Sequence, residues 1–220
     1  MSGIVGSKIN VKGSGVVDKL GTDGQALTSA GAGLPLGFET AGGGMWSKIK
    51  FQEVTAGGAS LEFINGTSGV TFDSTYTYYM LQFRNYVGSV ADRKMALEIS
   101  TDTGGSWKTS GYECCSWQSG FDDAKRLAYD YSLLATQEMG IVAGEGAFGF
   151  IMLQNPAQAA MPSSLYVITQ GQNSQDPQGY SYVGAGVYTT AGAYDGVRFT
   201  TSGGSGEITT LQATLYGHTD

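Results

Sequence analysis

Histidine is nearly absent from this chain, and its scarcity removes most of the familiar catalytic arrangements. His218 is the only histidine among 220 residues, and it is the third residue from the end. A Ser-His-Asp or Cys-His mechanism would have to use it, and no GxSxG motif is present. A zinc site of histidines and thiolates is excluded by the same count. We therefore expect His218 to be a solvated tail residue, and we do not expect an enzyme.

Charged residues are also scarce, at 14% of the chain, against roughly 25% in average domains. Nineteen acidic residues outnumber 12 basic ones, which gives a net charge of -7 and a pI near 4.6. An acidic chain lacks the basic surface of a nucleic-acid binder, so no nucleic-acid partner is expected. Small polar residues and tyrosines take the place of charge, a mixture that suits extracellular or virion surfaces.

Cysteines and long apolar runs are few as well. Cys114 and Cys115 are the only cysteines and are adjacent. Neighbouring side chains of a strand point to opposite faces, and a bond between them would be strained. We expect two reduced thiols, with an intermolecular disulfide as the alternative. The longest apolar run, near residues 147–153, is too short to span a bilayer, and no signal peptide is recognised, so no membrane insertion is expected.

Glycine is abundant and unevenly distributed. Residues 1–45 hold 12 of the 35 glycines but only one of the 25 aromatic residues. Such a segment cannot build a core of its own, so we interpret residues 1–45 as an extended anchoring arm. The run Gly42–Gly44 forms a flexible joint, and residues 46–220 form one domain. The apolar residues with which the arm would bind an assembly partner are Ile4, Val5, Ile9, Val11, Leu20, Leu27, Leu34 and Phe38.

The remainder of the chain alternates between apolar and polar residues, which predicts strands. The expected strands are 47–54, 61–64, 70–72, 76–87, 95–99, 112–117, 146–153, 165–170, 180–187, 195–201 and 207–216. Asn65-Gly66 predicts a two-residue hairpin between the second and third of these. Residues 122–139 fit a helical stripe or a strand, and we favour a loop followed by a strand that ends near Gln137. Ten to twelve short strands indicate an all-β fold, an antiparallel, jelly-roll-like β-sandwich.

One local motif lies between two of these strands. Residues 100–107, STDTGGSW, resemble the Asp box of sialidase-type propellers, in which an Asp side chain binds the backbone of a turn above a packed Trp. Propellers carry several copies and this chain has one. We therefore expect a structural hairpin around Asp102 and Trp107, without sialidase activity.

Candidate ligand-binding residues are mainly aromatic. Aromatic rings in or beside expected loops could bind saccharides or pack between subunits: Trp107, Trp117, Tyr180, Tyr182, Tyr188 and Tyr194. A glycosidase would instead need two carboxylates about 5–9.5 Å apart, and the acidic residues considered are Asp122, Asp123, Glu138, Glu145 and Asp176. We expect these acids to be solvated. No cofactor is expected, with Ca²⁺ bound by loop oxygens as a weak alternative.

The arm also carries a recognisable segment. Residues 21–39, GTDGQALTSAGAGLPLGFE, resemble a segment that recurs in bacteriophage fibre and other virion proteins, especially of marine phages. There the pattern is GTDGQVLTS, then alternating small residues and glycines, a proline and an aromatic; this chain has Ala26 where Val is usual. Residues 195–199, 206–209 and 215–217, together with Asn155-Pro156 after an apolar strand, are similar to the closing part of those proteins.

This resemblance implies a virion structural protein. The virion proteins that carry this segment are typically homotrimers, with an arm docked on other virion proteins and a β-sandwich displayed outward. We expect a head decoration protein or short capsid fibre, located in the virion. The alternative is a tail-fibre or spike tip that binds host surface glycans, and a depolymerase is a third, weaker possibility.

Overall fold

The computed structural model divides the chain into two units, Met1–Met45 and Trp46–Asp220. The residues that it describes are 25–28, 37–40, 45–90, 94–120, 125–130, 146–154, 156, 163–172, 179–202 and 206–219. The division follows the run Gly42–Gly44.

The described part of the first unit is a two-stranded antiparallel sheet. Strand β1 (Gln25–Thr28) pairs with β2 (Gly37–Thr40), and Leu27 lies opposite Phe38. The sequence of residues 21–33 also predicts a turn, a short strand and another turn; β1 confirms that strand, whereas β2 was not predicted. The other six apolar residues assigned to anchoring lie outside the described residues: Ile4, Val5, Ile9, Val11, Leu20 and Leu34.

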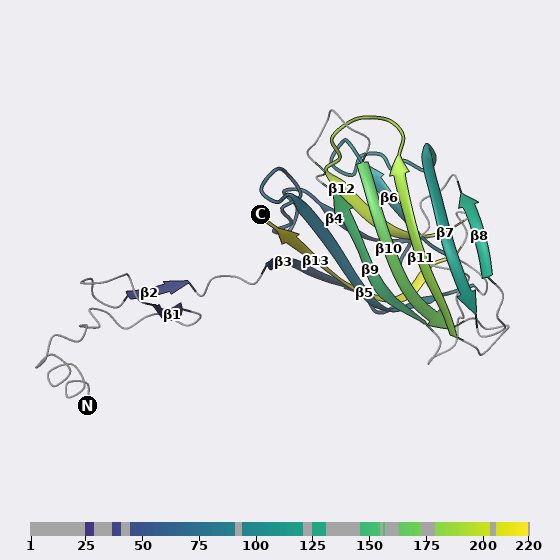
Figure 1. Cartoon of the computed structure of the whole chain (residues 1–220), viewed down its shortest axis with the longest axis horizontal. Coiled ribbons are helices and arrows are strands. Elements are labelled where there is room, and N and C mark those ends of the chain that lie inside the picture. The colour runs from purple at the N-terminus through teal and green to yellow at the C-terminus, as the bar shows by residue number, and fades with distance from the viewer. Residues whose placement is uncertain are drawn as a thin grey trace, which may run out of the picture. The chain divides into compact units, whose positions relative to one another are not determined.

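The second unit contains an eight-stranded and a three-stranded sheet, and all their pairings are antiparallel (Figure 1). The large sheet has the order β3 (Trp46–Val54), β13 (Ile208–His218), β5 (Tyr78–Gly88), β9 (Ala147–Gln154), β10 (Ser163–Gln172), β11 (Gly179–Tyr188), β7 (Tyr112–Gly120) and β8 (Lys125–Asp130). The small sheet has the order β4 (Ser60–Ile64), β12 (Gly196–Thr201) and β6 (Met95–Ser100). The all-β prediction is confirmed for the described residues, and two antiparallel sheets are consistent with the expected sandwich.

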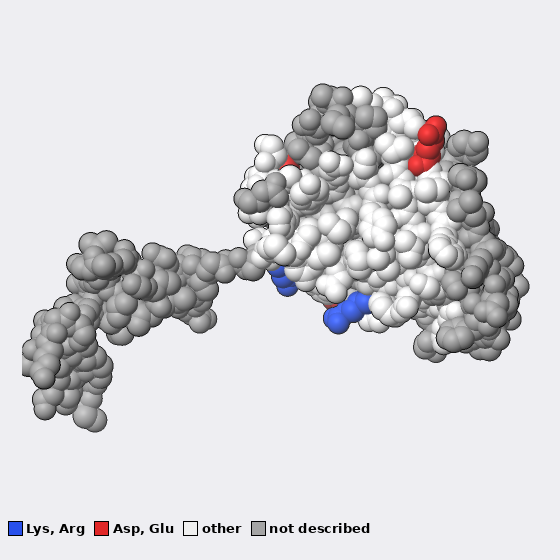
Figure 2. Space-filling view, in the orientation of Figure 1, with Lys and Arg blue, Asp and Glu red and all other residues white. Residues whose placement is uncertain are grey.

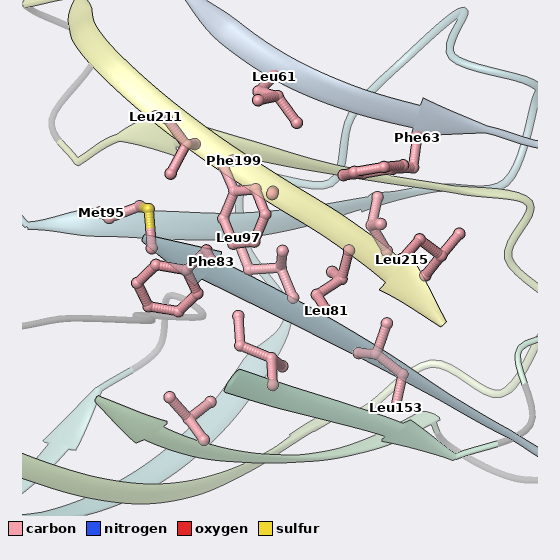
Figure 3. Packing of buried hydrophobic residues seen from close by; sticks show 14 of the residues in the cluster. Leu61, Phe63, Leu81, Phe83, Met95, Leu97, Leu153, Phe199, Leu211 and Leu215 are labelled. Carbon is pink, nitrogen blue, oxygen red and sulfur yellow. The ribbon is translucent and has the colours of Figure 1, made fainter. Parts of the chain in front are cut away.

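The core lies between the two sheets (Figure 3). Alternate residues of β13, including Leu211 and Leu215, are fully buried against the small sheet. Phe83 of β5 meets Phe199 of β12 across the interface, with their ring centroids 5.6 Å apart. Burying each such side chain stabilises the fold by about 1.5–3 kcal/mol. This period-two burial fixes which face of each strand points outward.

The prediction of a hairpin at Asn65-Gly66 is wrong. The turn forms, since Thr67 N–H donates to Ile64 C=O at 3.0 Å, but only Gly66 of its two central residues has positive φ. The hairpin turn expected for Asn-Gly needs positive φ at both. Residues 70–72 are not a strand, and β4 pairs with β12 instead. Val70 and Phe72 are nevertheless buried in the core, which explains their strand-like apolar spacing.

The ambiguous stretch 122–139 contains strand β8, so the preference for a strand over a helix is confirmed there. The expected end near Gln137 lies outside the described residues. The described part of the chain has no helix that could cross a membrane.

Candidate binding face on the outer side of the large sheet

Large apolar side chains are concentrated on the face of the eight-stranded sheet that points away from the core. The exposed large hydrophobic residues of the described chain are Met45, Phe51, Tyr78, Val90, Trp117, Phe148, Tyr166 and Val183. All except Met45 and Val90 occupy outward positions of this sheet, as the alternation with buried neighbours shows. Trp117 and Phe148 are each 56% exposed. Clusters of this kind on a protein surface mark binding sites more often than isolated exposed residues do.

Strand register places these side chains in rows across the sheet. One row of cross-strand partners crosses seven strands: Trp117, Val183, Ile168, Phe150, Gln82, Thr214 and Phe51. The next row is Cys115, Ala185, Tyr166, Met152, Met80, Tyr216 and Lys48. Residues in register on one face are close neighbours. We refer to this surface as the outer face.

Few charged side chains interrupt the outer face. In Figure 1 the strands β9, β10, β11 and β7 run side by side, and in the same orientation Figure 2 shows mostly uncharged atoms there, with blue and red patches near the margins. A sheet face toward water normally carries polar and charged residues. The outer face is therefore built more like a contact surface than a solvated one.

A groove of about 760 Å³ crosses the outer face over β3, β13, β5, β9 and β10. Its lining combines aromatic rings, glutamine amides and two cations. The lining includes the side chains of Lys48, Phe51, Gln82, Arg84, Phe148, Phe150, Gln170, Gln212 and Tyr216. Ligand pockets commonly have volumes of about 300–1,000 Å³, so the groove is large enough for a small molecule or a segment of a polymer.

Hydrogen bonds fix the polar groups of the groove. Gln212 Oε1 accepts from Arg84 Nε at 2.9 Å and from Asn85 Nδ2 at 3.2 Å, and Gln212 Nε2 donates to Glu53 at 3.1 Å. Tyr216 Oη donates to Gln82 Oε1 at 3.4 Å. These contacts join three strands, β3, β5 and β13, and they hold the amides of Gln82 and Gln212 in set orientations before any ligand binds.

A β-bulge in β5 places Arg84 at this site. The register of β5 shifts between Phe83 and Tyr86 relative to β9, and Asn85 has a φ of 56°. Bulges redirect side chains locally, and here Arg84 and Asn85 are both exposed while Phe83 and Tyr86 are buried. Sequence reasoning missed the groove, although Arg84-Asn85 interrupting an apolar alternation was a visible signal of the bulge.

The aromatic residues predicted from sequence do not form one site. Trp117 lies on the outer face. Trp107 lies beneath Arg198, whose guanidinium carbon is 4.7 Å from the centroid of the Trp107 ring. Tyr188 packs on Tyr112 with ring centroids 5.2 Å apart. The side chain of Tyr180 lies outside the described residues.

Tyr182 and Tyr194 correct the sequence interpretation. Both are buried in the core, and Tyr194 packs against Phe72 with ring centroids 5.5 Å apart. Neither is accessible to a ligand. Tyr182 lies within the expected strand, β11, on the face that points into the core, and Tyr194 precedes β12.

The hairpin expected around Asp102 is confirmed. Asp102 accepts hydrogen bonds from Ser106 N at 2.8 Å, Ser106 Oγ at 2.6 Å and Ser100 Oγ at 2.9 Å. These bonds lower the pKa of Asp102 to about 2, with the Ser106 hydroxyl as the largest cause. Trp107 is half-buried beside this turn. The motif is explained by turn geometry.

His218 is not a solvated tail residue, contrary to expectation. It ends β13, and its backbone carbonyl accepts from Thr77 N–H at 2.9 Å. Its ring lies 5.1 Å from Trp46 and 6.2 Å from Tyr78, measured between centroids. Pairing of β13 with both β3 and β5 brings this histidine into an aromatic cluster.

The cysteines occupy opposite faces of β7, as predicted. Cys115 is exposed on the outer face, Cys114 packs against the core, and no disulfide joins them. Within the described residues, no group of three His, Cys, Asp or Glu residues could hold a metal ion. The acids considered for glycosidase chemistry lie outside these residues: Asp122, Asp123, Glu138, Glu145 and Asp176.

Comparison with protein-family models gave no match, and no match was found among curated proteins or among solved structures.

Proposed function

We propose that this protein is a structural component of a bacteriophage virion, a head decoration protein or short capsid fibre. Residues 1–45 dock on other virion proteins, and the jelly-roll-like sandwich forms an outward knob of three copies. The single observation that carries the assembly role is the apolar outer face of the large sheet. The proposed location in a virion depends on the resemblance of residues 21–39 to a segment of bacteriophage virion proteins.

The outer face supports contact between copies over β10, β11 and β7. Tyr166, Val183 and Trp117 are exposed there, at 42%, 38% and 56%. Their outward neighbours in the two rows are Ile168, Ala185 and Cys115. We refer to these six residues as the assembly patch. None of the six side chains is charged, so burying the patch against another copy removes no charged group of the patch from water. Another copy is the proposed occupant.

Light scattering after size exclusion tests this contact. Wild-type protein should have the mass of a trimer, and Trp117→Glu should reduce it to a monomer, since a carboxylate would be buried without a partner. The matched control is Val90→Glu, which places the same charge at another exposed apolar residue (41% exposed) and should leave the trimer intact. A monomeric wild type, or a trimer in the Trp117 variant, would contradict the proposal.

Incorporation into particles tests the virion role. Particles purified from cells that express the full chain should contain it, and deletion of residues 1–45 should remove it from particles while leaving a folded trimer. Three linked arms raise the local concentration of each at its docking site. A truncated protein that still joins particles would refute the docking role of residues 1–45.

A second candidate function is recognition of host surface glycans by a tail-fibre or spike tip. The groove favours it, because aromatic rings and amides lie together there. This candidate shares the trimeric knob and differs in its partner.

A further inference from the structure

We infer that the groove over β3, β13, β5, β9 and β10 binds an acidic oligosaccharide, a chain of sugars that carries carboxylate or sulfate groups. The inference rests on the second candidate function, recognition of glycans, and names the class of ligand; it is independent of the assembly role, because the groove residues are distinct from the assembly patch except for Ile168 at their border. It assigns the ligand by the charge, the rings and the amides of the groove.

Charge favours an anionic ligand. The whole chain has a net charge of -7, yet the groove is lined by Lys48 and Arg84 and, among the described residues, by no carboxylate. Glu53 stands next to the lining, and its carboxylate accepts the hydrogen bond from Gln212 Nε2. Arg84 uses Nε for Gln212, and within the described residues its terminal nitrogens make no other hydrogen bond, so they can donate to a carboxylate or sulfate.

The apolar lining favours sugar rings. Phe148 of β9 is 56% exposed and Phe51 of β3 is 37% exposed, and both line the groove. Solvent-exposed aromatic rings such as these can stack against the C–H faces of pyranose units. Lys48 Nζ lies 5.9 Å from the centre of the Phe51 ring, which places a cation beside one of the two stacking positions.

The amides complete the fit to a polyhydroxylated chain. Gln82, Gln170 and Gln212 line the groove, and an amide can donate to one hydroxyl and accept from another. Gln82 has its oxygen engaged by Tyr216, and among the described residues its nitrogen makes no hydrogen bond. That nitrogen is available as a donor, and its position is fixed by the bond to Tyr216.

An extended peptide fits the same groove less well. Peptides that bind sheets usually add a strand at an edge and use backbone hydrogen bonds. Here β13, β5 and β9 are each paired on both sides, so the floor of the groove offers side chains only. A saccharide, which is recognised through side chains, needs no free edge.

The experiment is a binding screen of the full-length protein on immobilised oligosaccharides. The probes are uronate-containing, sialylated and sulfated oligosaccharides, each with a neutral counterpart of similar length. Wild-type protein should bind at least one acidic probe and should prefer it to its neutral counterpart. Binding should weaken between about 50 and 500 mM salt, because the ion pairs are exposed to screening.

Two groove variants give the decisive comparison. Arg84→Gln should weaken binding of the acidic probe by about tenfold or more, since a hydrogen bond to a charged group is lost. Phe148→Ala should weaken binding of the acidic probe and binding of its neutral counterpart by a similar factor. Lys108→Gln and Val90→Ala are matched controls away from the groove and should bind as wild type does.

The outcomes separate this inference from the assembly role. Loss of binding in the groove variants, with folding and oligomeric state unchanged from wild type, supports the saccharide site. No binding to any acidic probe, or binding that is unchanged in both groove variants, overturns it, whatever the oligomeric state. Binding that disappears only in Trp117→Ala would place the ligand on the assembly patch and would also overturn it.

Discussion

Gly149 shows how closely single residues are fitted in the large sheet. A Cβ at this position in β9 would overlap the carbonyl oxygen of Ile168 and backbone and side-chain atoms of Thr169 on the neighbouring strand β10. Because backbone atoms cannot move aside as a flexible side chain can, β9 and β10 would have to separate beside the groove.

We expect Gly149→Ala to lower the free energy of unfolding by about 1–3 kcal/mol, the usual cost of overpacking. Urea denaturation measures it. The matched control is Gly192→Ala, where a Cβ would meet nothing within 4 Å, and its stability should change little. Equal stability of both variants would show that the strands tolerate the added methyl group.

Asp102 gives a prediction for acid pH. Its pKa falls from 3.8 to about 2 through hydrogen bonds from Ser106 and Ser100. A carboxyl with a lowered pKa in the folded state stabilises the fold fully above its unfolded pKa, and this contribution is lost as the pH falls through the folded value. The stability difference between wild type and Asp102→Asn should therefore shrink from about pH 4 to about pH 2. Urea denaturation at several pH values tests this, and a difference that is constant with pH would contradict it.

At the scale of elements, the side chain of Asn65 helps to hold the loop that follows β4, beside backbone bonds such as that from Gly66 N–H to Val70 C=O at 2.9 Å. Asn65 Oδ1 accepts from Phe72 N–H at 2.9 Å, and this bond holds residues 65–72 so that Val70 and Phe72 reach the core. The following residue, Asp73, is also held in place, because its N–H donates to Tyr79 Oη at 2.9 Å. The apolar segment that looked like a strand is thus a loop attached to the sandwich by side-chain acceptors.

We expect Asn65→Ala to cost about 1–3 kcal/mol of stability, because the N–H of Phe72 would lose its acceptor. Asn65→Asp keeps an acceptor in place and should cost less. Thermal unfolding of the two variants compares them directly. If Asn65→Ala is as stable as wild type, the side chain does not hold this loop.

The elements also show what sequence could and could not predict. Strands such as β6 and β13 were found because their apolar residues alternate and face one core. The partner of β4 was missed because strand pairing is set by the core over long sequence distances, and Asn65-Gly66 favoured a local partner. The groove was missed for the same reason: its lining comes from five strands whose order cannot be read from alternation.

At the scale of the whole molecule, the two units differ in what stabilises them. The described core draws its buried residues entirely from the second unit, from Leu61 to Leu215. The described part of the first unit is one pair of four-residue strands, and an isolated two-stranded sheet is marginally stable. Cooperative unfolding of the chain should therefore be a property of residues 46–220.

We accordingly expect a fragment of residues 46–220 to fold alone, with a Tm close to that of the full chain. The described core residues all lie within 46–220, and a domain of this size buries roughly 70% of the surface of its unfolded chain. Differential scanning calorimetry of both proteins, at matched oligomer concentration, measures the two Tm values. A loss of 1 kcal/mol would lower the Tm by about 2–4 °C in a domain of this size. A fragment that melts more than about 5 °C below the full chain would show that residues 1–45 contribute to the stability of the sandwich.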